Sequence, residues 1–117
     1  RPRQVLSGAP SSIPFMPSYR VQFEIMGLRP GNRPEAVLDG AVAAIGENFH
    51  VDDRQIDVIA GTPRVTVRYT VPDSSDAEEI ALALMARDAA HEAIDAVAVA
   101  GRDWTLRRVG GRWIPVS

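Results

Sequence analysis

The densest group of side chains that could do chemistry consists of Asp88, His91, Glu92 and Asp95. Residues at positions i, i+3, i+4 and i+7 share one face of a helix, so three carboxylates and an imidazole can point the same way. They could bind a metal ion or transfer protons. A helix-based metal site also needs ligands from neighbouring helices. Because the other predicted helix carries its acids on a face expected in water, we favour a solvated acidic surface.

A second polar group, His50 with Asp52 and Asp53, could act as a general base or offer oxygen ligands to a cation. Its composition is more typical of a loop after a helix, and we expect a loop there. The chain contains no Cys and no Lys. This excludes disulfides, thiolate metal sites, a Schiff-base lysine and a phosphate-loop lysine. We therefore predict no metal site, no cofactor and no catalytic residue, while an enzyme built on Asp88 or His50 stays the disfavoured alternative.

A third candidate site lies where the first predicted helix begins. Asn32 is a good N-cap, Pro34 suits the first turn, and the position of Glu35 completes a capping box. Free amide groups at a helix start can bind a phosphate or carboxylate. Arg29, Asn32 and Arg33 are therefore the expected ligand-binding residues if the protein is a regulatory domain for a small anionic molecule.

The elements that must position these residues follow from hydrophobic periodicity. Residues 19–26 alternate between apolar and polar, as do residues 64–71, and period two is typical of half-buried strands. Apolar residues recur at helical spacing over 35–49 and over 76–97, where Ser75 and Glu78 form a capping box. Residues 55–60, 104–109 and 112–116 are further strands, the last two forming a hairpin around Gly110-Gly111.

This order predicts an α+β domain with a ferredoxin-like βαββαβ arrangement and an extra C-terminal edge strand. Two helices would cover one face of a single antiparallel sheet, and right-handed crossovers favour this topology over a cystatin-like alternative. We expect residues 19–117 to form this domain, and the Pro- and Ser-rich residues 1–18 to be a linker or an extended docking arm. Both tryptophans, Trp104 and Trp113, are expected in the core.

The predicted alternation leaves one sheet face uncovered. If the odd-numbered side chains point toward the helices, polar side chains occupy the open face, joined by Arg107 or Arg108 from a later strand. The expected partner-binding residues are Arg20, Gln22, Arg64, Thr66 and Arg68. An RNA-recognition sheet would carry central aromatic residues at these positions, so the pattern disfavours nucleic acid.

The sequence therefore favours a non-catalytic interaction module that binds a protein partner, or a second copy of itself, through the open face or an edge strand. The net charge of −2 attracts neither nucleic acid nor an anionic membrane, and the apolar runs are too short for a membrane span of about 20 residues. We expect a cytoplasmic protein from a high-GC bacterium. The chain begins at Arg1 without Met, so we also expect a trimmed or excised segment whose targeting signal could have been removed.

Overall fold

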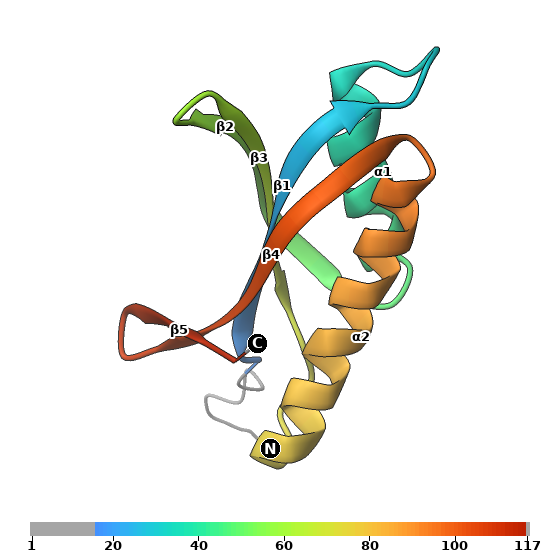
Figure 1. The fold of residues 1–117 in the computed structure, drawn as a ribbon. Helices are drawn as coiled ribbons and strands as arrows, with labels where there is room; N and C mark the ends of the chain where they lie inside the picture. The colour runs from blue at the N-terminus through green and yellow to red at the C-terminus, as the bar shows by residue number, and fades with distance from the viewer. Residues whose placement is uncertain (1–15, 117) are drawn as a thin grey trace, which may run out of the picture.

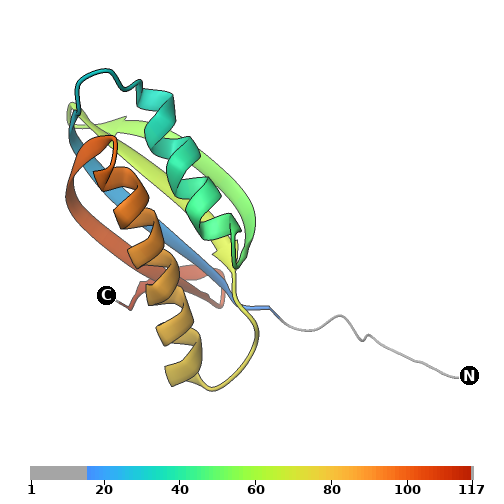
Figure 2. The same cartoon turned by 90° about the vertical axis from the view of Figure 1, so that its right-hand side faces the viewer.

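The computed structural model describes residues 16–116 and contains five strands and two helices. In chain order the elements are β1 (Ser18–Leu28), α1 (Pro34–Gly46), β2 (His50–Ile59), β3 (Thr62–Thr70), α2 (Asp76–Asp95), β4 (Ala98–Val109) and β5 (Arg112–Pro115). The strands form one antiparallel sheet in the order β2-β3-β1-β4-β5. Both helices lie side by side on one face of it (Figures 1 and 2). The predicted α+β class is confirmed, and the strand order is that of a ferredoxin-like sheet with β5 added beside β4.

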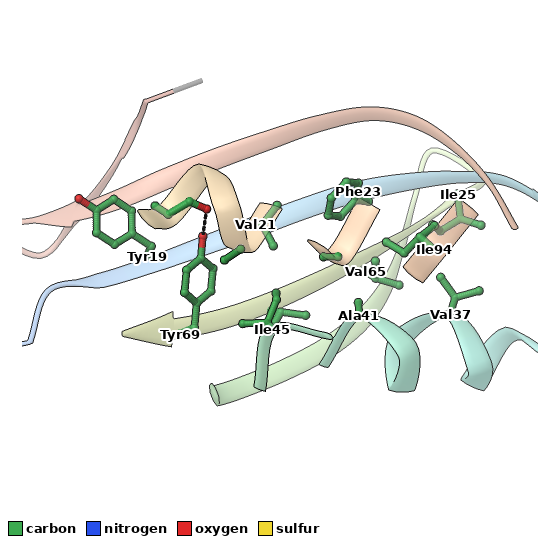
Figure 3. Close-up of a cluster of buried hydrophobic side chains, with 14 of the residues drawn as sticks. Tyr19, Val21, Phe23, Ile25, Val37, Ala41, Ile45, Val65, Tyr69 and Ile94 are labelled. Carbon is green, nitrogen blue, oxygen red and sulfur yellow. Dashed lines mark hydrogen bonds between the residues drawn. The ribbon is translucent and has the colours of Figure 1, made fainter. Parts of the chain in front are cut away.

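The two central strands place their odd-numbered side chains under the helices, as the alternation predicts. In this register Tyr19 lies opposite Tyr69, Val21 opposite Val67, and Phe23 opposite Val65. All six side chains are almost fully buried. Figure 3 shows that Val37, Ala41 and Ile45 of α1, with Ile94 of α2, close over them. The core therefore lies between the sheet and the helices, and the even-numbered side chains face the other way.

Two buried tyrosine hydroxyls connect the sheet to α2. The Tyr69 hydroxyl donates a hydrogen bond of 2.9 Å to the Ala83 carbonyl (Figure 3). The Tyr19 hydroxyl donates to Oε1 of Glu79 at 3.3 Å, and Arg107 Nη2 lies 3.2 Å from the same oxygen. The buried Glu79 carboxylate is thus paired with a cation, as a charge in a core must be. Arg107 therefore faces the helices and does not join the open face.

The predicted start of the first helix is wrong, whereas that of the second is confirmed. Helix α1 begins at Pro34 with Arg33 as N-cap and without a side-chain cap. The Asn32 amide instead donates to the carbonyl oxygens of Arg29 and Pro30, so it stabilises the preceding turn. At the start of α2, the Ser75 hydroxyl accepts from the Glu78 amide as a capping serine does.

Two hairpins extend beyond the helix layer and bend away from it (Figure 1). Strands β2 and β3 meet at Ala60-Gly61, and β4 and β5 meet at Gly110-Gly111. The expected loop at His50–Asp53 is wrong, because these residues begin β2, where an edge strand tolerates charged side chains in water. Strand β4 begins at Ala98, six residues before the predicted start at residue 104.

Residues 1–15 lie outside the described part of the chain, so the predicted linker or docking arm is largely untested. At its end, the Val71 amide donates to the Pro17 carbonyl at 3.1 Å, which extends the pairing of β1 with β3. Within residues 16–116, neither helix is long and apolar enough to cross a membrane.

Candidate binding site on the open sheet face

The open face is built on the even-numbered residues of β1 and β3. Arg20 lies opposite Arg68, Gln22 opposite Thr66, and Glu24 opposite Arg64. Residues directly opposite each other in an antiparallel pair point to the same side. The structure thus brings together the five predicted partner-binding residues on the face away from the helices.

At one end of this face, three arginines surround a single tryptophan. The guanidinium carbons of Arg20, Arg68 and Arg108 lie 4.6, 5.5 and 5.5 Å from the centre of the Trp113 ring. We call these four residues the Trp113 cluster. Guanidinium groups at this distance are attracted by the electron-rich ring face.

The expectation that Trp113 is a core residue is wrong, and the hairpin turn explains why. The two-residue turn Gly110-Gly111 places Val109 opposite Arg112 and Arg108 opposite Trp113. Arg108 and Trp113 therefore share a side, and the bend of the hairpin carries both toward the open face. The Gly-Gly turn in the sequence already implied this pairing, but not the direction of the bend.

The other end of the open face partly neutralises its own charge. Arg64 and Arg102 flank the ring of Trp104, at 4.6 and 5.1 Å from its centre. Both also pair with Glu24, whose oxygens lie 3.9 Å from Arg64 Nη2 and 3.3 Å from Arg102 Nε. The hydrogen bond from Arg102 holds the pKa of Glu24 below its usual range, so the carboxylate stays ionised. Trp104 is also half-buried on this face, contrary to the expected core position.

In contrast, no carboxylate in the described part of the chain forms an ion pair with the Trp113 cluster, although Asp53 lines the pocket beside it. Within residues 16–116, no Asp or Glu forms an ion pair with Arg20, Arg68 or Arg108. The Nε atoms of Arg20 and Arg68 are buried and have no hydrogen-bond partner in this part of the chain. Burial, and then the positive charges of Arg68 and Arg108, lower the pKa of Arg20. Since a guanidinium still remains protonated, the cluster is a concentration of unneutralised positive charge.

A pocket of about 90 Å³ opens beside this cluster. It is lined by Arg20, Asp53, Arg54, Gln55, Thr66, Arg68 and Trp113. Asp53 lies opposite Arg68 in the strand register, but its Oδ1 accepts from the Arg54 amide at 2.8 Å. The pocket therefore places guanidinium groups, the Gln55 amide and the Asp53 carboxylate around a space large enough for a further carboxylate.

Gln22 and Thr66, in the middle of the face, form a hydrogen bond with each other. Gln22 Nε2 donates to the Thr66 hydroxyl at 3.4 Å, and only 6% of Thr66 is exposed. These two residues form the floor between the two tryptophans, and the accessible polar groups belong to the arginines around them.

The expected anion site at the first helix does not bring its three residues together for a ligand. Arg29 Nε donates to the Asp95 carbonyl at 2.6 Å, which caps the end of α2. The Asn32 side chain is engaged in the turn, and Arg33 is exposed. Because two of the three donors already have partners, the open face is the better candidate.

The polar face of α2 is also largely engaged in local contacts. His91 stacks on Phe23 with ring centres 5.9 Å apart, and its Nε2 lies 3.7 Å from Asp95. Asp88 pairs with Arg87 at 2.7 Å. The exposed pair His50–Asp52 lies on β2, with 3.2 Å between Nε2 and Oδ1. In the described range 16–116, no three His, Asp or Glu side chains lie close enough to hold a metal ion.

Comparisons of this chain with models of protein families, with curated proteins and with solved structures find no match. An α+β sheet of this kind supports unrelated functions, so its function has to be inferred from particular side chains. The cytoplasmic location and the bacterial origin stay predictions.

Proposed function

We propose that this protein is a non-catalytic interaction module that binds an acidic segment of a protein partner on its open sheet face. The observation that carries this proposal is the Trp113 cluster, in which three guanidinium groups gather on one ring without a carboxylate partner among the described residues. Elsewhere on the same face, Arg64 and Arg102 share Glu24. The cluster therefore holds three guanidinium groups with no paired carboxylate among the described residues, whereas the other end of the face has one carboxylate for two arginines.

An acidic side chain from a partner would supply the missing charge. Guanidinium groups bind carboxylates through two parallel hydrogen bonds, and such charge-assisted bonds are stronger than neutral ones. The planar groups of Arg20 and Arg68 are already held against Trp113, so less side-chain entropy is lost on binding. The pocket between them and Gln55 gives one carboxylate a defined position.

Several features favour a protein partner over nucleic acid. Single-stranded nucleic acids bind by stacking bases on free aromatic faces. Here guanidinium groups lie against Trp104 and Trp113, and the centre of the sheet carries Gln22 and Thr66. Two copies of this face also cannot meet head-on, because their arginine clusters would repel each other.

The test is calorimetric titration with a Glu-rich peptide. Replacing one guanidinium that contacts the ligand should cost about 1.5–3 kcal/mol, so Arg20→Gln and Arg68→Gln should each weaken binding by about tenfold or more. Arg112→Gln is the matched control, because this substitution removes the same charge at an exposed position of β5. Its binding constant should stay within about twofold of the parent value.

Two results would refute the proposal. The first is equal weakening by Arg112→Gln and Arg68→Gln, which would indicate attraction by net charge alone. The second is a single-stranded oligonucleotide of the same charge that binds more tightly than the peptide, because this would make nucleic acid the better ligand.

A further inference from the structure

Strand β2 forms a long edge of the sheet, and its protecting features, a register irregularity and most of its charged side chains, lie in its first half. Its ten residues contain no proline, and in the described part of the chain no strand pairs with its outer side. The opposite edge is the four-residue β5, which ends at Pro115. Natural proteins usually shorten or interrupt edge strands, because free backbone groups pair with other chains. The long β2 edge therefore needs an explanation.

The hairpin turn determines which backbone groups face outward. Ala60 and Gly61 have φ of 51° and 80°, as in a type I′ turn, and they place Ile59 opposite Thr62. In a two-residue hairpin the closing pair is hydrogen-bonded, and the pattern alternates from there. The amides and carbonyls of Arg54, Ile56 and Val58 therefore point away from β3.

One hydrogen bond both supports this assignment and limits its consequence. The Arg54 amide donates to the Asp53 side chain at 2.8 Å, so it is not bonded to β3. The same bond blocks this end of the edge, whereas the described residues provide no such side-chain bond for Ile56 or Val58. The groups free to pair are thus concentrated near the hairpin tip.

Apolar side chains are exposed at the same place. Ile56 lies opposite Val65 on the helix side of the sheet, but the hairpin extends past α1, so 42% of Ile56 and 69% of Val58 are exposed. Beside them is an almost wholly apolar groove of about 180 Å³. It is lined by Ile25, Met26, Gly27, Leu28, Pro34, Val37, Ile56, Pro63 and Val65.

We propose that β2 pairs antiparallel with β2 of a second copy, with Ile56 on the two-fold axis. This register places Ile56 opposite Ile56, Arg54 opposite Val58, and Gln55 opposite Asp57 of the second copy. The two isoleucines cover each other on the helix side. Gln55 Nε2 already donates to Asp57 of its own strand at 2.7 Å, and its second amide hydrogen would bond the Asp57 carboxylate of the second copy. Such an isologous contact uses the same surface of both copies, so it gives a closed dimer in which the two five-stranded sheets are joined.

Neighbouring registers bring like charges together. An axis at Gln55 would place Asp53 opposite Asp57, an axis at Asp57 would place that carboxylate opposite itself, and an axis at Arg54 would oppose two guanidinium groups. Like charges directly opposite each other destabilise a strand pair. The in-plane contact leaves the Trp113 cluster uncovered, although it uses Gln55, which also lines the pocket beside that cluster. The dimer does not require the proposed function, because it rests on the β2 edge and not on the arginines.

Disulfide trapping tests the register, because the chain has no cysteine of its own. Paired Ile56→Cys residues would have Cα atoms about 5.5 Å apart, within the range of disulfides. We expect Ile56→Cys to form covalent dimers under mild oxidation. Gln55→Cys alone should not, but a mixture of Gln55→Cys and Asp57→Cys should, because these two positions are opposed. Absence of the Ile56→Cys dimer, or equally fast dimerisation of Gln55→Cys alone, would overturn the register.

Sedimentation equilibrium of chains without cysteine tests the dimer itself. The unmodified protein should dimerise reversibly, and Val58→Lys should raise the dissociation constant by about tenfold or more. Ile114→Lys is the matched control, since Ile114 is 43% exposed on the opposite edge strand. A monomer at millimolar concentration, or equal effects of the two lysine variants, would overturn the proposal.

Discussion

The guanidinium of Arg20 lies 4.6 Å from the centre of the Trp113 ring, although the first and the last described strands contribute these two residues. The contact forms because β4 pairs with β1 and carries the β4–β5 hairpin toward the open face. It turns an ordinary polar sheet face into one with a focus of positive charge. The same contact also ties the C-terminal hairpin to the sheet, so the proposed recognition and the stability of the hairpin depend on shared side chains.

Ser75→Ala should lower the free energy of unfolding by about 1 kcal/mol, because it removes the hydroxyl that accepts from the Glu78 amide at the start of α2. Ser74→Ala is the matched control. The hydrogen bond described for Ser74 comes from its backbone amide, which the substitution keeps. Urea denaturation of both variants measures the difference, and equal losses would contradict the assigned cap.

Ala60→Gly should raise the free energy of unfolding by about 1 kcal/mol, because Ala60 holds φ at 51°, a left-handed conformation that strains a side chain. The converse change, Gly61→Ala, should destabilise the hairpin through backbone strain alone, since Gly61 has φ of 80° and an added Cβ would meet no other atom. Thermal unfolding of the pair checks the turn geometry on which the β2 register depends. A loss of stability in Ala60→Gly would argue against a strained turn.

Stability should fall in alkali because of the buried tyrosines. Burial raises the pKa of Tyr19 from 10.0 to about 12, with the Glu79 carboxylate adding to the effect and Arg107 opposing it, and burial also raises the pKa of Tyr69. Above pH 10 the unfolded chain loses phenolic protons that the folded chain retains, which favours unfolding. The free energy of unfolding should therefore decline from about pH 10 to about 12.

Phenolate absorbance and denaturation across this pH range provide the measurements. Tyr19→Phe should make the decline shallower while leaving the response below pH 10 unchanged. Phenolate absorbance of the folded protein that rises around the ordinary pKa of 10.0 would contradict the buried placement.

Much of the fold follows from local patterns. The alternation around Val21 and Val67 is strong enough to fix which side chains enter the core, and hence which arginines lie outside. The capping serine of α2 was also predictable, because both hydrogen bonds of its hydroxyl are made with Glu78, three residues along the chain. Asn32 failed as a cap for the opposite reason, since two carbonyls of the preceding turn take its amide.

The candidate site was only half predictable. Arg20 and Arg68 follow from the sheet register, but Trp113 joins them through the bend of a terminal hairpin, which local periodicity does not encode. A tryptophan in an alternating strand is usually a core residue, which is why the sequence predicts a buried Trp113. That prediction is wrong, because the bend of the hairpin places the ring on the open face. Likewise, the charged residues of His50–Asp53 favour a loop because charge is common in loops, but an edge strand accepts the same residues.

The most direct test of the acidic-partner proposal is the NMR spectrum of the arginine Nε–H groups during titration with a Glu-rich peptide. Arg20 and Arg68 should show the largest changes, because their guanidinium groups border the pocket and lack carboxylate partners among the described residues. Arg87 and Arg107, already paired with Asp103 and Glu79, should stay unchanged and serve as internal controls. Unperturbed Arg20 and Arg68 signals under saturating peptide would contradict the proposal.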